Sequence, residues 1–388
     1  MKPKIAIIQR VCTNYRKGLF AKLSALDQFQ VKIFIGDDVA NSKTKNAKDL
    51  SGLDLVRLPT RHMKLGSREL LWHQGLLREL ERFQPDALLC EGNSNLLSFL
   101  LAKYYRWSHP EAALIQWSLG GLPGERETSR FRLKSIIRRH LRSGVDGFLL
   151  YSSFARDVLN REGVSVDKMY VAVNVSDTKS HLERAAAIQD SPAEARNRLG
   201  LPERFTVLYV GEVEPGKRLE QLLAAAQNPI LAKCSFLIVG DGCHTETLRL
   251  MAREKSLTNV IFTGKVEPSQ VPLYYKSSDV FVLPGLGGMV ISEAMAYGLP
   301  VIVFQADGTE RDLVLDGKTG IRLSRGDACE ISQAIKSLLD SPDKGKVMGA
   351  EGRKLIIHSY SSENMVKQIC HCLEETIQRR HSSMETRP

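Results

Sequence analysis

The sequence contains no long apolar run. No segment approaches the length of a membrane-spanning helix, and the start, Met1-Lys-Pro-Lys-Ile-Ala-Ile-Ile, enters a strand-like stretch without a small-residue cleavage site. We therefore expect a cytoplasmic protein that has neither a signal peptide nor a membrane-spanning helix. Low-complexity segments and short internal repeats are also missing, which argues against a disordered or repeat protein.

Cysteine is sparse and scattered. Only Cys370 and Cys372, which flank His371, lie close together, and this triplet lacks the second pair of ligands that a structural zinc site needs. We expect buried free thiols, with no disulfide framework and no bound metal.

Two ligand-binding signatures are missing as well. The chain has no nucleic-acid reader motif and few aromatic residues among its basic ones, so nucleic acid is not an expected partner. No Gly-x-Gly-x-x-Gly follows the first strand of either half, which disfavours a nicotinamide dehydrogenase.

What the chain does have is the length and composition of two globular domains. It has 388 residues, of which 43% are hydrophobic and 25% charged. Residues 1–180 contain 29 Lys and Arg against 18 Asp and Glu, so they hold the whole of the +10 net charge. The densest basic segment, residues 129–142, fits a helix on an anionic membrane or facing a phosphorylated substrate, and equally a solvated helix face.

Strand-like apolar runs alternate with helical stretches along the chain. Such strands indicate parallel sheets covered on both faces, so we expect an α/β fold with two doubly wound domains at 1–180 and 205–358. A linker is expected at 181–204, and a helix at 359–388 that crosses back to the first domain. Helices are further expected at 67–83 and 95–107, and strands at 5–8, 31–34, 55–58, 87–89, 113–116, 147–150, 169–173, 205–210, 236–239, 260–262, 280–283, 301–303 and 320–323.

Residues 284–300, Pro-Gly-Leu-Gly-Gly-Met-Val-Ile-Ser-Glu-Ala-Met-Ala-Tyr-Gly-Leu-Pro, predict an anion site. They form a glycine turn followed by a short helix, and a strand stands on either side of this pair. The glycines let a ligand approach the backbone. A helix that begins near Met289 would direct its free N–H groups at negative charge. Glu293 would add one carboxylate a turn further on. Taken alone, the same pattern also fits a simple tight turn.

Further motifs accompany this loop in a fixed order. They are Tyr-Val-Gly-Glu-Val-Glu-Pro-Gly-Lys (209–217), Ile-Val-Gly-Asp-Gly (238–242), Phe-Thr-Gly-Lys-Val (262–266) and Asp-Gly-Lys-Thr-Gly (316–320). Together they resemble the retaining glycosyltransferases of family 4, in the subset with a Pro-Gly-x-Gly-Gly loop. The resemblance implies the GT-B fold, two facing Rossmann-like domains with an interdomain cleft, in which the first domain binds the acceptor and the second the nucleotide sugar. The first half is a weaker match, at residues 14–20, 151–156 and 173–177.

The resemblance also implies roles for single residues. Lys217 would bind the departing diphosphate, whose negative charge grows in the transition state. Glu293 would be the second of the family's paired glutamates and would hold the ribose, and both residues are expected to serve catalysis. Further donor contacts are expected at Gly211, Gly240, Gly242, Lys265, Val266, Gly287, Gly288, Met289 and Val290, and acceptor contacts at Asn14, Tyr15 and Arg16.

Some positions depart from the family pattern. Glu212 stands where an arginine is common, and Gly285 where the first glutamate of the pair would fall. Arg218, or a basic residue of the first domain, is a candidate to supply the missing charge. The glycine-rich turn after the first strand is replaced by residues 10–16. No acceptor-side histidine lies near Gln116, although three others are available, His62, His73 and His140.

We expect a retaining, metal-independent hexosyltransferase without a cofactor. It would move a sugar from a nucleoside-diphosphate sugar to a hydroxyl acceptor, such as a glycan or a polyprenyl-diphosphate glycan for the cell envelope. An anionic surface on the inner face of the membrane is a further partner to be considered. A catalytically silent GT-B protein that binds a nucleotide or a partner is the alternative, followed by a GT-B epimerase or phosphorylase.

Overall fold

The computed structural model describes residues 2–39, 44–65, 68–92, 96–123 and 139–385. They form two compact units. The first contains the described part of residues 1–121 and 139–173 together with residues 363–385, and the second contains Asn174–Ser362 with Leu122 and Pro123. Most of the basic segment 129–142, namely residues 129–138, lies outside the described residues.

The first unit is built on a seven-stranded parallel sheet of order β3-β2-β1-β6-β7-β8-β9. Its strands are β1 (Lys4–Gln9), β2 (Gln30–Gly36), β3 (Leu55–Leu58), β6 (Ala87–Glu91), β7 (Ala113–Ser118), β8 (Gly147–Leu150) and β9 (Met169–Val171). Successive side chains point to opposite faces, and most strand residues are buried on both, which explains the continuous apolar runs.

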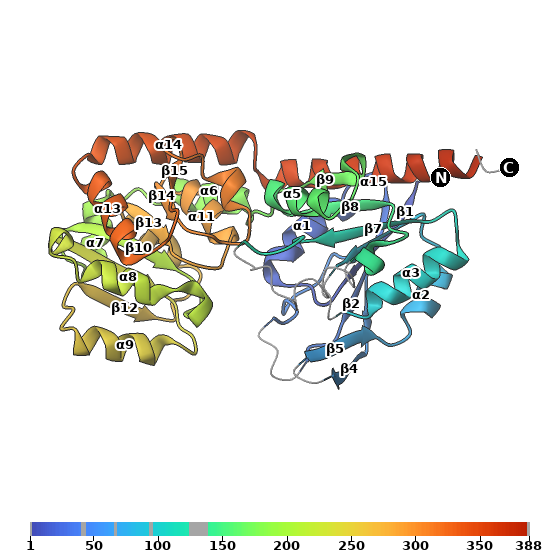
Figure 1. The fold of residues 1–388 in the computed structure, drawn as a ribbon, viewed down its shortest axis with the longest axis horizontal. Coiled ribbons are helices and arrows are strands. Elements are labelled where there is room, and N and C mark those ends of the chain that lie inside the picture. The colour runs from blue at the N-terminus through green and yellow to red at the C-terminus, as the bar shows by residue number, and fades with distance from the viewer. Residues whose placement is uncertain (1, 40–43, 66–67, 93–95, 124–138, 386–388) are drawn as a thin grey trace. The chain divides into compact units, whose positions relative to one another are not determined.

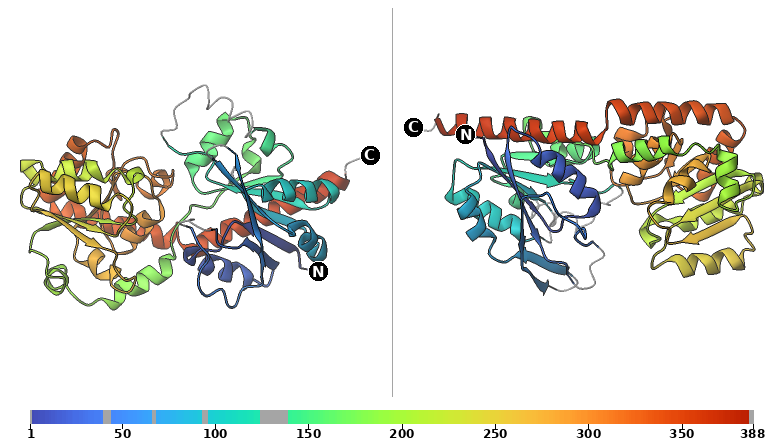
Figure 2. Two further views of the ribbon diagram at one scale, coloured as in Figure 1. Left: turned by 90° about the horizontal axis from the view of Figure 1, so that it is seen from below. Right: turned by 180° about the vertical axis from the view of Figure 1, so that it is seen from behind.

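Helices cover both faces of this first sheet. One face packs against α2 (Leu76–Phe83), α3 (Ser98–Ser108) and α5 (Ser153–Arg161). The other packs against α1 (Asn14–Ser24) and the C-terminal α15 (Ser362–Glu385), which Figures 1 and 2 show running along the sheet. Two contacts hold α15 there: Glu363 accepts a 2.7 Å bond from Lys22 of α1, and Arg380 donates to the Pro110 carbonyl.

The expected helix at 67–83 is wrong in its first half. Residues 68–73 belong to β5 (Arg68–His73), which pairs antiparallel with β4 (Thr60–Leu65) to form a hairpin beside the main sheet. Leu71 and His73 are buried while Leu70 and Trp72 are partly exposed, the alternation of a strand. Gly75, with φ 84°, is the N-cap that directly precedes α2.

The second unit has a six-stranded parallel sheet of order β12-β11-β10-β13-β14-β15. Its strands are β10 (Phe205–Val210), β11 (Cys234–Val239), β12 (Val260–Gly264), β13 (Val280–Leu283), β14 (Val301–Val303) and β15 (Gly320–Arg322). The helices are α6 (Thr178–Ala187), α7 (Pro192–Arg198), α8 (Leu219–Ala226), α9 (Thr245–Glu254), α10 (Val271–Lys276), α11 (Met289–Ala296), α12 (Glu310–Leu313), α13 (Ala328–Leu339) and α14 (Pro342–His358). In this unit α8 packs against α9 and α13, and α11 against α6 and α14.

The stretch 181–204, which the sequence presents as a linker, is mostly helical. It contains the end of α6 and all of α7, and both helices cluster with the second unit. Ser191 caps α7 with a capping box in which Glu194 takes part, so polar residues that suggest a loop here serve as a helix start.

Both sheets reverse their strand order at one point. The reversal lies between β1 and β6 in the first unit and between β10 and β13 in the second. In doubly wound sheets, ligands bind beside the carboxyl ends of the strands at such a switch point. The residues that follow β10 and β13 are therefore the first place to look for a site in the second unit, and those that follow β1 and β6 in the first.

Candidate functional site

Glycines bring the loops after β10 and β11 into direct backbone contact. Gly211, with φ 147°, donates its N–H to the Val239 carbonyl at 3.0 Å. A Cβ at Gly240 would collide with the Gly211 carbonyl, and one at Gly242 with the Val213 carbonyl. The Gly242 N–H is already bonded to Asp241 and Thr245. These three predicted donor-site glycines therefore shape the loops, and Gly242 has no free N–H for a ligand.

The loop after β13 meets Lys217 at the switch point. Lys217 ends a short 3-10 turn, Pro215–Lys217, and its Nζ donates to the Leu286 carbonyl at 2.7 Å. The Leu286 N–H in turn bonds to the Gly216 carbonyl at 2.9 Å. A Cβ at Gly287 would lie 3.3 Å from Lys217 Nζ. The structure thus brings together Lys217 and the glycine loop, which the sequence placed in one site.

The amino end of α11 points its first N–H groups at this same place. Gly288 precedes the helix without a side-chain cap, and the helix begins with Met289 and Val290, both partly exposed. Free N–H groups and the helix dipole attract an anion at such an end. Burial lowers the pKa of the Lys217 ammonium, while the nearby carboxylates of Glu212 and Asp307 oppose that effect.

Asp307 is a site residue that the sequence did not reveal. Its carboxylate lies so close to Gly288 that a Cβ there would collide with it, and it accepts bonds from the Thr309 N–H and hydroxyl. It follows β14 in a short Asp-Gly turn, and that turn is the one signal that marks it. Its negative charge stands beside the helix end that would receive an anion.

Glu293 lies on the second turn of α11, beside the aromatic ring of Tyr275. It accepts a 3.2 Å hydrogen bond from the Tyr275 hydroxyl, and His181 Nε2 lies 3.7 Å from its other oxygen. Burial raises the pKa of Glu293 to about 7 and lowers that of His181 to about 4. His181 is therefore neutral near pH 7, and the pair is not a full ion pair. Neither Tyr275 nor His181 was predicted as a site residue.

The remaining donor-side candidates follow the edge of the sheet. Lys265 is exposed and Val266 partly exposed, directly after the edge strand β12. Arg218 is the candidate to supply the positive charge that is lost where Glu212 replaces an arginine. Its guanidinium lies 4.7 Å from the Phe304 ring centre and donates a hydrogen bond to the Gly326 carbonyl. Glu212 is exposed, and its carbonyl accepts a bond from Tyr209. The guanidinium of Arg218 is thus directed at the loops after β14 and β15.

In the first unit, the three acceptor-side candidates differ from one another. Asn14 and Tyr15 are exposed in the first turn of α1, whereas Arg16 is buried. The Arg16 side chain packs on Trp117 at the end of β7 and donates to Tyr151 at the end of β8. Among the three available histidines, His73 is fully buried and His62 and His140 are exposed.

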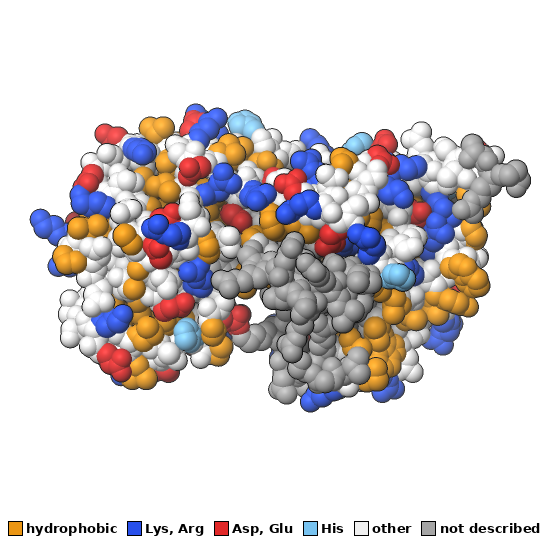
Figure 3. Space-filling view, viewed as in Figure 1, with side chains coloured by type: hydrophobic (Ala, Val, Ile, Leu, Met, Phe, Trp, Pro, Cys, Tyr) orange, Lys and Arg blue, Asp and Glu red, His pale blue; other side chains and the backbone are white. Residues whose placement is uncertain are grey.

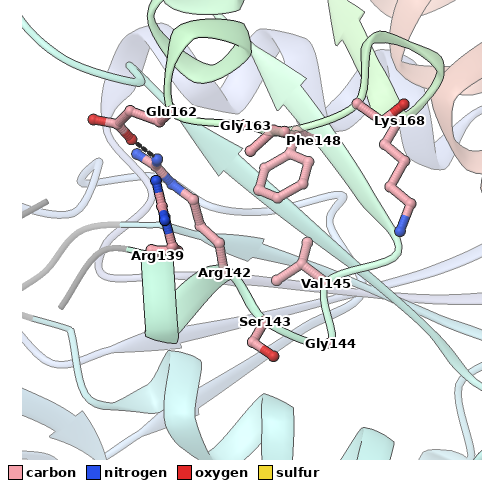
Figure 4. Close-up of a pocket in the computed structure, with 11 residues that line it drawn as sticks. Arg139, Arg142, Ser143, Gly144, Val145, Phe148, Glu162, Gly163 and Lys168 are labelled. Atoms are coloured by element: carbon pink, nitrogen blue, oxygen red, sulfur yellow. Dashed lines mark hydrogen bonds and ion pairs between the residues drawn. The ribbon is translucent and has the colours of Figure 1, made fainter. Parts of the chain in front are cut away.

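The cavity drawn in Figure 4 is not at either switch point. It has a volume of about 530 Å³ and is lined by Phe148 of β8 and by residues that precede β8 and β9, at the amino edge of the first sheet. In Figure 4, Arg142 is directed at Glu162 on one side and Lys168 lies on the other, with Phe148 and Val145 between them. Ligands of doubly wound sheets bind at the opposite edge, so we do not assign this cavity to the chemistry.

Within the described residues, no group of three His, Cys, Asp or Glu side chains is placed to hold a metal ion. No helix in those same ranges is both long and apolar enough to cross a membrane.

The family model that matches this chain lies in the second unit. Residues 192–355 match the family model described as glycosyl transferases group 1. The chain is 33% identical over 186 residues to the GDP-mannose-dependent alpha-(1-6)-phosphatidylinositol monomannoside mannosyltransferase of Mycolicibacterium smegmatis, which covers 44% of this chain and 48% of the relative. It is 27% identical over 244 residues to alpha-monoglucosyldiacylglycerol synthase of Streptococcus pneumoniae, covering 61% and 53%. The matches thus span about half the length of these curated relatives.

Structural comparison extends over nearly the whole chain. The crystal structure of Anabaena Alr3699/HepE in complex with UDP matches with a TM-score of 0.74 at 15% identity, covering 96% of this chain and all of that one. Sucrose-phosphate synthase of Thermosynechococcus elongatus matches with a TM-score of 0.72 at 19% identity, covering 97% and 100%. The expected GT-B fold is confirmed, and residues 192–355 match the family model described as glycosyl transferases group 1.

Proposed function

We propose that this protein is a glycosyltransferase that moves a sugar from a nucleoside-diphosphate sugar to a hydroxyl acceptor. The observation that carries the proposal is the meeting of Lys217, the glycine loop and the amino end of α11 at the switch point of the second sheet. A fixed cation and free N–H groups at one point suit a diphosphate leaving group, because its charge grows as the sugar departs.

The reaction would proceed with retention at the anomeric carbon, as in family 4 and its Pro-Gly-x-Gly-Gly loop subset. Lys217 and the N–H groups of Met289 and Val290 would bind the diphosphate, and Glu293 the ribose. The leaving phosphate would help to deprotonate the acceptor hydroxyl in a front-face displacement. This route requires neither a metal nor a cofactor.

For the acceptor, we propose a lipid-linked glycan precursor at an anionic membrane surface. One curated relative is named for a phosphatidylinositol monomannoside and another for a glucosyldiacylglycerol, so both names refer to lipid-linked sugars. The basic excess of residues 1–180 suits an acidic lipid surface.

The test is a panel of UDP, GDP and ADP sugars, assayed for binding and for slow hydrolysis by the wild type, Lys217→Met and Lys255→Met. Lys255 is exposed at the end of α9 and provides a matched loss of charge outside the site. We expect Lys217→Met to lower kcat/KM by about 100-fold or more, the typical effect of removing one charge-stabilising group. Lys255→Met should behave as wild type. Equal activity of the two variants would refute the site.

A catalytically silent nucleotide-binding protein is the second candidate. It is favoured by the carboxylate of Asp307 beside Gly288 and by Glu212, since both add negative charge near a diphosphate site. Such a protein would bind a sugar nucleotide with an affinity that depends on Lys217, but would neither hydrolyse nor transfer the sugar.

A further inference from the structure

The switch point of the first sheet gathers polar side chains on one face. Gln9, Glu91, Trp117 and Tyr151 lie at or just beyond the carboxyl ends of β1, β6, β7 and β8, which are neighbours in the sheet. Register places Glu91 opposite Trp117, and all four have the odd-numbered parity of the face that α1 covers. This is the edge at which a doubly wound domain binds ligands.

Arg16 is held over this edge by aromatic rings. Its guanidinium carbon lies 4.3 Å from the Trp117 ring centre, 5.2 Å from that of Tyr151 and 5.5 Å from that of Tyr15. Arg16 Nη2 donates a 2.6 Å hydrogen bond to the Tyr151 hydroxyl. The residue is only 6% exposed, so three rings and one hydrogen bond fix a nearly buried cation.

No Asp or Glu of the described ranges forms an ion pair with Arg16. Glu91, the carboxylate on this face, accepts the Arg10 N–H at 2.9 Å, and its charge and that of Arg16 both act on Tyr151. Buried charges are normally paired, because an isolated one costs several kcal/mol of solvation. Tyr151, whose pKa burial raises to about 12, stays neutral and supplies no negative charge.

Buried hydrogen-bond donors around Arg16 also lack an acceptor among the described residues. Within the described residues, Trp117 Nε1, Gln9 Nε2 and Thr13 Oγ1 have no hydrogen-bond partner, although the three residues are 1%, 4% and 8% exposed. The Thr13 side chain does not cap α1, and its carbonyl accepts the N–H groups of Arg16 and Lys17, so the first turn adds the N–H groups of Asn14 and Tyr15 as further donors. Trp117 contacts Arg16 directly, and Gln9 lies on the same face and edge.

We propose that Arg16, with Trp117 and Gln9, binds a phosphoryl group at the switch point of the first unit. The guanidinium, the indole N–H and the amide of Gln9 are all donors, and an oxyanion with several acceptor oxygens satisfies them together. The inference rests on the proposed glycosyltransfer, because that reaction offers two phosphoryl groups: one in a phosphorylated acceptor and one in the donor diphosphate.

The experiment measures binding directly by isothermal titration calorimetry. The probes are dihexanoyl phosphatidylinositol, dihexanoylglycerol, which has the same chains without a phosphate, and the nucleotides UDP and GDP. The variants are Arg16→Met and a matched control, Arg78→Met, whose side chain is 72% exposed on α2. We expect Arg16→Met to weaken binding of the phosphatidylinositol by about tenfold or more, the usual effect of losing a charged hydrogen bond. The affinity of Arg16→Met for dihexanoylglycerol should equal that of wild type. Arg78→Met should bind every probe as wild type does.

Each outcome decides the proposal. If Arg16→Met loses affinity only for UDP or GDP, the phosphoryl group belongs to the donor. If it loses affinity only for phosphatidylinositol, the phosphoryl group belongs to the acceptor. No difference between Arg16→Met and Arg78→Met for any phosphorylated probe would overturn the proposal, as would a wild type that binds none of them. If Arg16→Met fails to fold, Tyr151→Phe replaces it, since it removes only the hydroxyl that orients Arg16 and should weaken binding a few-fold.

Failure of the proposed function is a separate result. It would appear as a wild type that binds no sugar nucleotide, or as Lys217→Met binding one as well as wild type. Neither finding changes the comparison between phosphatidylinositol and dihexanoylglycerol for Arg16→Met.

Discussion

The charge at the amino end of α11 depends on two side chains, Lys217 and Asp307. A carboxylate beside a diphosphate site repels the ligand, whereas an amide of the same shape does not. Asp307→Asn keeps an oxygen that can accept the bonds from Thr309. We therefore expect Asp307→Asn to tighten binding of a nucleoside diphosphate several-fold, measured by calorimetry with UDP and GDP.

The control for this substitution is Asp343→Asn, which removes an exposed carboxylate in the first turn of α14. It should leave nucleotide affinity unchanged. Weaker binding by Asp307→Asn would show instead that the carboxylate orders the loop or binds the ligand itself, and the repulsion argument would then be wrong.

Glu293 gives the second unit a pH dependence with a definite sign. Its pKa is raised from 4.5 to about 7, so the folded state holds a proton that the unfolded state releases between these values. The stability of the unit should therefore fall as pH rises through this window. Glu293→Gln cannot lose a proton, so its free energy of unfolding should exceed that of wild type by up to about 3 kcal/mol at pH 8 and by little at pH 4.5.

Hydrogen exchange of α11 measures this difference, because all three tryptophans, Trp72, Trp107 and Trp117, lie in the first unit and fluorescence would not report on the second. The low pKa of His181 has the opposite effect, since its contribution to stability is lost as pH falls from 6.5 towards about 4. That contribution is present in both proteins and cancels in the comparison. A difference between variant and wild type that stays constant from pH 5 to 8 would contradict the assignment.

Among the elements, the glycine loop after β13 depends on close backbone packing. A Cβ at Gly285 would lie 2.5 Å from the Gly216 carbonyl and 2.7 Å from that of Lys217. Gly285→Ala should therefore lower the free energy of unfolding by about 1–3 kcal/mol and weaken nucleotide binding, since the loop must move away from Lys217. Gly285→Glu should do the same, because it introduces the same Cβ.

The control is Gly345→Ala in the interior of α14, where the nearest atom to a new Cβ is 3.8 Å away. This change should stabilise the helix by up to about 1 kcal/mol. Thermal unfolding of the three variants checks the comparison. Equal effects of Ala at both positions would mean that the loop has room for a side chain.

The sequence predicted most strands because their apolar runs are continuous. β10, β13 and β14 begin and end where the runs do. It failed at β5, where Glu69, Leu70, Leu71 and Trp72 also fit a helix and only the pairing with β4 across the hairpin decides for a strand. It also failed for α6 and α7, whose polar surfaces resemble a linker because little of either helix is buried.

The candidate site was predictable only where a local sequence motif marks its residues. The glycine loop and Lys217 are marked by motifs and were placed together correctly. Asp307 and Tyr275 come from other loops and helices, and nothing local identifies them. The surroundings of Arg16 likewise depend on the order of strands in the first sheet, which places Trp117 and Tyr151 beside α1.

For the whole molecule, the uneven charge of the two halves has a consequence for membranes. Residues 1–180 carry 29 Lys and Arg against 18 Asp and Glu, and Figure 3 shows Lys and Arg spread over the described part of one face rather than gathered in one patch. A diffuse basic surface attracts an acidic bilayer weakly and over a distance that salt shortens, from about 10 Å in 0.1 M salt to about 3 Å in 1 M. We therefore expect the protein to cosediment with phosphatidylglycerol-containing vesicles in 0.1 M salt, to be released in 1 M salt, and to ignore pure phosphatidylcholine vesicles.

The variants locate this attraction within the molecule. Arg61 and Lys64 are exposed on β4 of the first unit, and Arg253 and Lys255 are exposed at the carboxyl end of α9 in the second. Replacing the first pair by Gln should reduce the bound fraction in 0.1 M salt, whereas replacing the second pair, which removes the same charge, should change it little. Equal losses for the two pairs would mean that net charge alone drives binding. Binding that does not depend on salt would remove the electrostatic argument for a membrane surface altogether.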